Sequence, residues 1–107
     1  MLQAPQRGVS NLQTVEGKIS EIIYLPGAAP DSGMVEIRVE AAGQPKLVRL
    51  APSGFLKQGG ILLREGDTVT LKGFLVNAME GDLIVATEIR RADKTLVLRD
   101  QRGRTAW

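Results

Sequence analysis

The feature that most limits the fold of this chain is a repeated pattern of short alternating runs separated by turn residues. Runs rich in Val, Ile, Leu and Thr alternate with charged residues, and Gly, Pro and Asp interrupt them at short intervals. In residues 33–42, for example, Val35, Ile37 and Val39 point to one side of an extended chain and the charged residues between them to the other. The pattern predicts an all-β protein.

The runs can be assigned to successive strands. In the first, "TVEGKISEIIYL", the alternation from Val15 slips phase towards Ile22, which predicts a β-bulge. A hairpin centred on Gly43 and Gln44 is expected to join the second and third strands. Residues 51–67 break the alternation and have room for only a short helical turn. Three further strands are expected, at residues 68–77, 83–92 and 95–100.

This order predicts a five-stranded OB-fold, a Greek-key barrel, with a short plug between strands three and four and an extra C-terminal strand. Gly17 and Gly73 stand inside strands, where a tight barrel must coil sharply. An SH3-like barrel is the alternative, which the long segment between strands three and four disfavours. The side chains expected to be buried in the barrel are Val15, Ile19, Ile37, Val39, Val69, Leu71, Val85 and Ile89, with Phe55 and Leu56 in the plug.

The chain has 107 residues, of which 43% are hydrophobic, enough for one domain with a core. We expect a flexible N-terminal arm at residues 1–13 and a single domain at residues 14–107. The chain contains no cysteine and no histidine, so thiolate and histidine chemistry and the usual zinc sites are excluded. We therefore expect no enzymatic activity, no cofactor and no metal. No stretch approaches the roughly 18 apolar residues of a membrane span.

The C-terminal segment carries the excess positive charge. Residues 1–89 hold 8 basic and 10 acidic groups, a net charge of −2, whereas residues 90–107 hold 6 basic and 2 acidic groups, a net charge of +4. Guanidinium groups suit phosphate and carboxylate oxygens. The alternative is a solvated face with local ion pairs to Asp93 and Asp100. The candidate binding surface comprises Arg90, Arg91, Lys94, Arg99, Arg102, Arg104 and Trp107.

The only tryptophan, Trp107, stands at the last position. A frayed terminus buries nothing, so we expect a structured segment in which a turn at Gly103 brings Trp107 back over the barrel. Two interpretations remain open, a lid on the barrel end or an exposed stacking surface. OB-folds that hold single strands usually offer several aromatic side chains. Here the others are Tyr24, Phe55 and Phe74, and we expect Phe74 in the core.

The stretches "VEGKISEII", "LAPSGFLKQGGILLREGDTVTLKGF" and "LIVATEIRRADKTLVLRD" resemble a family of small bacterial OB-fold proteins of unassigned role. The likeness runs from about Thr14 onward, and its most specific part is the ending, with Leu98, Arg99, Asp100, Gly103 and Trp107 in the family's places. Many members are exported and some are labelled DNA-binding on fold alone. The resemblance implies a periplasmic location, although this chain has no signal peptide. The family often has Trp-Tyr-Leu where this chain has Gly54, Phe55 and Leu56.

Two functions of different class fit the sequence. The first is a non-enzymatic interaction module that engages a protein partner or a small ligand through its loops and the basic C-terminal segment. The second is a weak, sequence-tolerant binder of single-stranded nucleic acid. The few aromatic residues and the net negative charge of residues 1–89 favour the first.

Overall fold

The structure is a computed structural model that describes residues 12–29, 31–78 and 81–107. Most of the predicted arm, residues 1–13, therefore lies outside the described residues, while Leu12 and Gln13 belong to the first strand. The elements in chain order are β1 (Leu12–Tyr24), β2 (Met34–Ala41), β3 (Gln44–Pro52), α2 (Ser53–Gln58), β4 (Thr68–Ala78), β5 (Gly81–Arg91) and β6 (Lys94–Val97).

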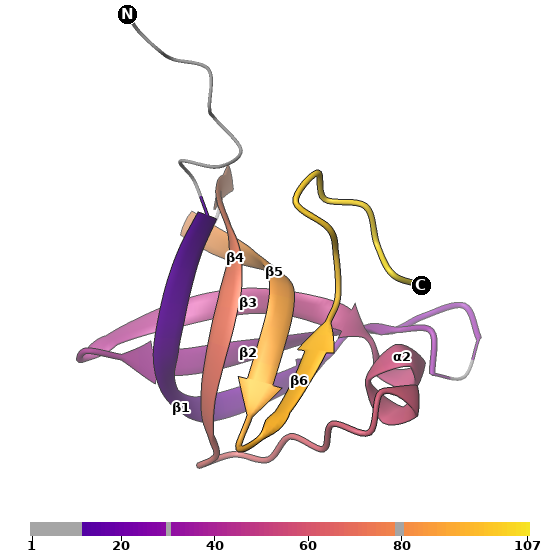
Figure 1. Cartoon of the computed structure of the whole chain (residues 1–107), viewed down its shortest axis with the longest axis horizontal. Coiled ribbons are helices and arrows are strands. Elements are labelled where there is room, and N and C mark those ends of the chain that lie inside the picture. Colours follow the sequence, from indigo (N-terminus) through magenta and orange to yellow (C-terminus); the bar gives the residue numbers. More distant parts are fainter. Residues whose placement is uncertain (1–11, 30, 79–80) are drawn as a thin grey trace, which may run out of the picture.

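The strands close into a barrel with the connectivity of an OB-fold (Figure 1). The first half of β1 pairs with β4 and its second half with β2, both antiparallel. A short parallel pairing between β3 and β5 closes the barrel, and β6 adds to the outer edge of β5. The predicted all-β barrel, with its plug and its additional C-terminal strand, is thereby confirmed.

The long first strand can pair with both β4 and β2 because it coils. The register shifts between Ile19 and Glu21, which confirms the predicted bulge. At Gly17, a Cβ atom would overlap the carbonyl oxygen of Glu40 and lie 2.8 Å from Val39 Cγ1. A side chain at this position would push β1 away from β2, so glycine permits the close crossing.

The core fills the barrel interior. It comprises Val15, Ile19, Val35, Ile37, Val39, Val48, Leu50, Ala51, Leu56, Ile61, Val69, Leu71, Ile84, Ala86, Ile89 and Leu98. Seven of the eight side chains predicted to be buried in the barrel are in this cluster, and Val85 is the exception because it is only half-buried.

Two residues predicted in the core lie on the outer face of the barrel instead. The register of β5 shifts opposite Lys72 and Gly73, which leaves Thr87 as an extra residue. The alternation therefore reverses between Ile89, which points inward, and Val85, which points outward. Phe74 lies opposite Val85 in the β4–β5 pairing and is likewise half-buried, so its predicted place in the core is wrong.

The turn and the plug differ from their predicted bounds by a few residues. The β2–β3 turn is centred on Ala42 and Gly43, with φ of 53° and 80°, one residue earlier than predicted. The plug contains the six-residue helix α2, in which Leu56 is buried and Phe55 packs half-buried against the core. The additional strand β6 spans Lys94–Val97, where residues 95–100 were predicted.

Candidate functional site

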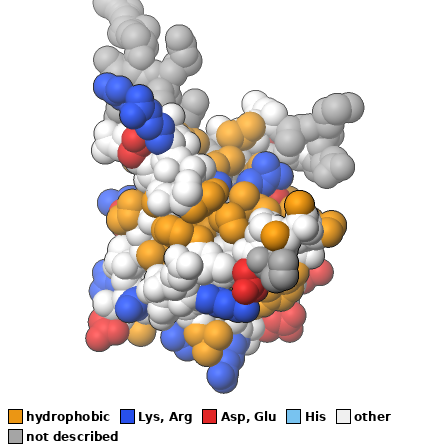
Figure 2. Space-filling view, turned by 90° about the vertical axis from the view of Figure 1, so that its right-hand side faces the viewer, with side chains coloured by type: hydrophobic (Ala, Val, Ile, Leu, Met, Phe, Trp, Pro, Cys, Tyr) orange, Lys and Arg blue, Asp and Glu red, His pale blue; other side chains and the backbone are white. Residues whose placement is uncertain are grey.

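The barrel divides the predicted basic surface between its two ends. Arg90 and Arg91 close β5 and Lys94 opens β6, so these three lie at the β5–β6 turn, at the bottom of Figure 1. Arg102 and Arg104 belong to the loop after β6, which lies at the top of the same view. Figure 2 shows Lys and Arg side chains in separate places around gathered hydrophobic side chains, not in one field. The six basic residues do not form a single surface.

The basic end at the β5–β6 turn is partly neutralised. Arg91 Nε donates to Asp67 Oδ2 at 2.8 Å, and Arg90 Nε donates to the carbonyl oxygen of Ala92 at 3.1 Å. The hydrogen bond from Arg91 lowers the pKa of Asp67, so this carboxylate keeps its charge beside the guanidinium. A polar groove of about 520 Å³ lies here, lined by Glu16, Asp67, Thr68, Thr70, Arg90, Arg91 and Ala92. Its lining therefore carries two acidic and two basic side chains.

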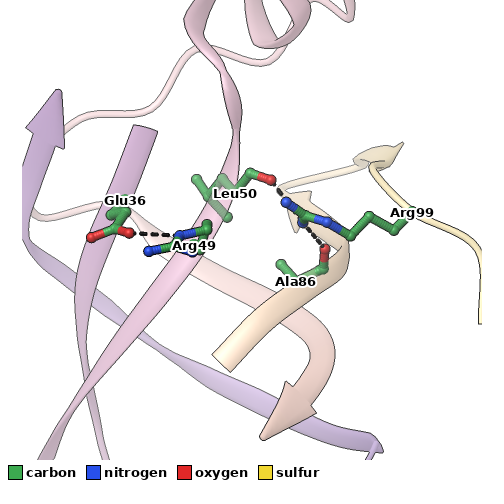
Figure 3. Close-up of polar contacts among 5 residues, drawn as sticks. All are labelled: Glu36, Arg49, Leu50, Ala86 and Arg99. Carbon is green, nitrogen blue, oxygen red and sulfur yellow. Dashed lines mark hydrogen bonds and ion pairs between the residues drawn. The ribbon is translucent and has the colours of Figure 1, made fainter. Parts of the chain in front are cut away.

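Arg99 is a buried structural residue, which corrects its assignment to a binding surface. Only 6% of its surface is exposed. Its Nη1 donates to the carbonyl oxygens of Leu50 at 2.8 Å and Ala86 at 2.6 Å, as Figure 3 shows. Burial, and then the charge of Arg49, lower the pKa of Arg99.

The physical reason for the burial of Arg99 is an irregularity after β6. The carbonyl oxygen of Thr87 accepts hydrogen bonds from the backbone N–H groups of both Leu98 and Arg99, at 2.7 and 3.1 Å. The regular alternation of the strand therefore stops after Val97, and both Leu98 and Arg99 turn into the protein. In the regular strand predicted at residues 95–100, these two side chains would have pointed to opposite sides.

The loop after β6 is tied together by one carboxylate. Asp100 Oδ1 accepts hydrogen bonds from the backbone N–H groups of Arg102 and Arg104, at 2.8 and 2.9 Å. The bond to Arg104 is the larger reason why the pKa of Asp100 is lowered. A bridge between Arg99 and Thr105 then returns the chain towards Trp107. The prediction that this segment is structured, with a turn at Gly103, agrees with this geometry.

Trp107 covers part of the barrel end without being enclosed. Its ring centroid lies 5.3 Å from that of Phe55, with the ring planes tilted by 53°. The guanidinium carbon of Arg99 lies 4.9 Å from the Trp107 centroid. However, 41% of Trp107 is exposed, so the ring is neither an enclosed lid nor a fully exposed stacking surface.

A groove lies beside the exposed part of this ring. It has a volume of about 550 Å³, and we call it the Trp107 groove; it is lined by Asp31, Ser32, Pro52, Gly54, Phe55, Gln58 and Trp107. Asp31 Oδ1 accepts from Lys57 Nζ at 2.8 Å, and this bond lowers the pKa of Asp31. No motif in the sequence points to a role for the loop that holds Asp31 and Ser32. Its Asp-Ser-Gly composition indicates only a turn.

The outer face of β2 and β3 is the surface on which OB-folds hold oligonucleotides. Here Arg38 is paired with Glu21 at 3.2 Å and Arg49 with Glu36 at 2.8 Å, the latter drawn in Figure 3. Glu40 adds a further carboxylate to the same row of alternating side chains. Both arginines on this face are thus compensated within the protein.

Two other kinds of site are absent from the described residues. No helix there is long and apolar enough to cross a membrane. Groups of three or more acidic side chains arranged to hold a metal ion are not found in the same part of the chain.

Comparison with known proteins gives one family and one fold. No curated protein matches the chain significantly. Two crystal forms of the mitochondrial single-stranded DNA binding protein Rim1 from S. cerevisiae are similar in structure. Form 2 has a TM-score of 0.55 at 14% identity and covers 78% of this chain and 94% of that one. Form 1 has a TM-score of 0.50 at 13% identity, with 78% and 93% covered.

At this identity the likeness to Rim1 shows the fold alone. The family match shows more than the fold. Residues 11–96, which are most of the chain, match the MamS/MamX magnetosome protein family. The expected membership of a small bacterial family is thus supported. The C-terminal motif from Leu98 to Trp107 lies beyond the matched residues and stays a prediction. The chain therefore belongs to the MamS/MamX magnetosome protein family.

Proposed function

We propose that this chain is a non-enzymatic OB-fold binding module that engages a protein partner through the Trp107 groove. The observation that carries the proposal is the exposed part of Trp107, which is 41% of its surface, held beside the groove by Phe55 and Arg99. A large aromatic side chain that is already positioned loses little conformational entropy on binding, and such side chains dominate the energetics of protein interfaces.

The groove offers a mixture of surfaces that suits a peptide or a protein loop. Phe55, Pro52 and Trp107 supply apolar area, whereas Ser32 and Gln58 supply hydrogen-bonding groups. Asp31 is already paired with Lys57, so it adds little net charge. A small ligand with an apolar body and a few polar groups would fit the same lining.

Binding of single-stranded nucleic acid is the weaker alternative. In its favour stands the fold, which is also that of the Rim1 proteins. Against it stand the paired arginines on the β2–β3 face and the division of the C-terminal basic residues between two ends of the barrel. The affinity for a nucleic acid depends on many unpaired Lys and Arg side chains along the path of its phosphate backbone.

The test of the protein-binding proposal places a photo-crosslinking amino acid at Gln58, which lines the groove and is exposed. Proteins of the source bacterium that crosslink at this position are identified, purified and titrated against the chain by calorimetry. We expect Trp107→Ala to weaken the affinity about tenfold or more. The control is Val97→Ala, which truncates another exposed apolar side chain, on β6, and should leave the affinity unchanged. Equal binding by both variants would contradict the proposal.

A second titration addresses the alternative. Fluorescence anisotropy of labelled single-stranded DNA and RNA, at two salt concentrations, should show binding no tighter than about 100 μM at physiological salt. The comparison variant is Arg102→Ala with Arg104→Ala, because both side chains are exposed while Arg99 is structural. Sub-micromolar binding that this double variant abolishes would make nucleic acid the primary partner.

A further inference from the structure

A second, apolar cleft lies on the other side of α2 from the Trp107 groove. The second half of β1 turns along the bottom of the barrel towards α2 in Figure 1. The cleft lies between the end of β1 and the segment that precedes β4, and we call it the β1-edge cleft. It has a volume of about 100 Å³, and its lining includes Ile22, Tyr24, Leu56, Ile61, Leu62 and Leu63.

The backbone of β1 is unpaired along this cleft. The pairing of β1 with β4 ends at Lys18 and Thr68. Farther along, the N–H group of Leu25 donates to the carbonyl oxygen of Met34, and antiparallel strands exchange such bonds at every second residue. The N–H and C=O groups of Ile22 and Tyr24 therefore point away from β2. Within residues 12–29, 31–78 and 81–107 they meet no partner strand.

The backbone of the opposite wall is also free of hydrogen bonds at Leu62 and Leu63, among the described residues. Residues 61–64 have no regular secondary structure. An extended chain lying between the two walls could therefore use the hydrogen-bonding groups of β1 without displacing existing bonds.

The rim of the β1-edge cleft is apolar. Tyr24 is 68% exposed and Leu62 is 61% exposed, and Leu25 stands beside Tyr24. Natural edge strands are usually guarded by lysine or proline residues. Here Pro26 stands beyond the end of β1, and Lys57, the charged side chain in the lining of the cleft, is paired with Asp31. This surface therefore matches an uncharged apolar partner.

We propose that the β1-edge cleft binds an extended peptide segment of a partner protein by strand addition. The backbone of the segment pairs with Ile22 and Tyr24, and one apolar side chain enters the cavity against Leu56. Alternate side chains of an added strand point to the same side, so apolar residues at every second position are the expected recognition pattern. This site is separate from the Trp107 groove, so the two proposals can fail independently.

The test uses the full chain and a synthetic library of acetylated octapeptides with Leu, Ile, Val or Phe at alternate positions and Ser or Thr between them. We expect saturable binding that shifts the ¹H–¹⁵N resonances of Ile22, Tyr24, Leu62 and Leu63 and slows amide exchange of Ile22 and Tyr24. Leu62→Glu should weaken this binding about tenfold or more, because it places a charge on the apolar rim. Val97→Glu is the matched control, since Val97 is equally exposed on β6.

Peptides N-methylated at the residues that would pair with β1 separate strand addition from simple hydrophobic capture. We expect methylation to abolish binding, because it removes the N–H donors of the added strand. Three results would overturn the proposal: no saturable binding by any octapeptide, equal binding by the methylated peptides, or resonance shifts centred on Trp107. A fourth result would name a different occupant. If the chain self-associates, if Leu62→Glu disrupts this association, and if no peptide binds, the occupant of the cleft is a second copy of the chain.

Discussion

The guanidinium of Arg99 donates a hydrogen bond of 2.8 Å to the carbonyl oxygen of Leu50, a residue 49 positions earlier in the chain. This contact lies where β3 and β5 separate, just beyond their last parallel pair, Arg49 and Val85. Leu50 is the extra residue of a bulge in β3, so its carbonyl group falls outside the regular pairing. The same nitrogen of Arg99 also donates to Ala86 of β5. One side chain thus joins the two strands across the closure of the barrel.

Replacing Arg99 should destabilise the fold. Arg99→Ala leaves the carbonyl groups of Leu50 and Ala86 without their donor, and we expect a loss of about 2 to 4 kcal/mol in the free energy of unfolding. Arg99→Lys should lose part of this free energy, because an ammonium group lacks the planar guanidinium that contacts the Trp107 ring. Urea denaturation followed by circular dichroism measures the difference.

The matched control for this experiment is Arg102→Ala, three residues along the same loop and exposed. It should change the free energy of unfolding by no more than about 0.5 kcal/mol. If Arg99→Ala proves as mild as Arg102→Ala, the closure of the barrel does not depend on this side chain.

Trp107 should contribute less to stability than an enclosed lid would. Trp107→Ala removes a tilted ring pair with Phe55 and a cation–π contact with Arg99, but 41% of the ring already faces water. We expect a loss of about 1 to 2 kcal/mol. The fluorescence of Trp107 should be partly accessible to iodide. Complete protection from iodide, with a loss above about 3 kcal/mol, would restore the enclosed lid.

The alternating pattern was sufficient to predict the barrel, its plug and most of its core. The phase slip before Ile22 and the glycines at 17 and 73 correctly marked where the strands coil. The errors at Val85 and Phe74 have another origin. The bulge at Thr87 arises from the pairing of β5 with β4, and Thr carries no local signal for an extra residue.

Gly17 offers a test of the coiling of β1. A methyl group at this position would overlap the carbonyl oxygen of Glu40, which belongs to the backbone of β2 and has no room to yield. We expect Gly17→Ala to lower the free energy of unfolding by about 2 kcal/mol or more. Glu16→Ala, at the exposed neighbouring position, is the control. Equal melting temperatures for the two variants would show that β1 and β2 can separate there at little cost.

The candidate site was less predictable than the fold because it depends on which ends of the strands meet. In the sequence, Arg90 and Arg104 belong to one basic segment, whereas β6 carries them to opposite ends of the barrel. The contact of Trp107 with Phe55 joins residues more than 50 positions apart, and composition gives no signal for it. The burial of Arg99 follows from the hydrogen bonds that the N–H groups of Leu98 and Arg99 donate to Thr87. No local sequence pattern predicts these two bonds.

The ion pair between Asp67 and Arg91 should make stability depend on pH in the acid range. Hydrogen bonds from Arg91 and from the backbone of Arg64 hold the pKa of Asp67 below its ordinary value of 3.8. The unfolded chain therefore binds this proton more readily than the folded one, so the stabilisation is complete above about pH 5 and is lost as the pH falls through the folded pKa. We expect Asp67→Asn to be less stable than the wild type at pH 7 and to approach it towards pH 2. Arg91→Gln removes the donor and should show the same convergence in urea titrations. A stability difference that stays constant from pH 7 to pH 2 in both variants would mean that the charge of Asp67 contributes nothing.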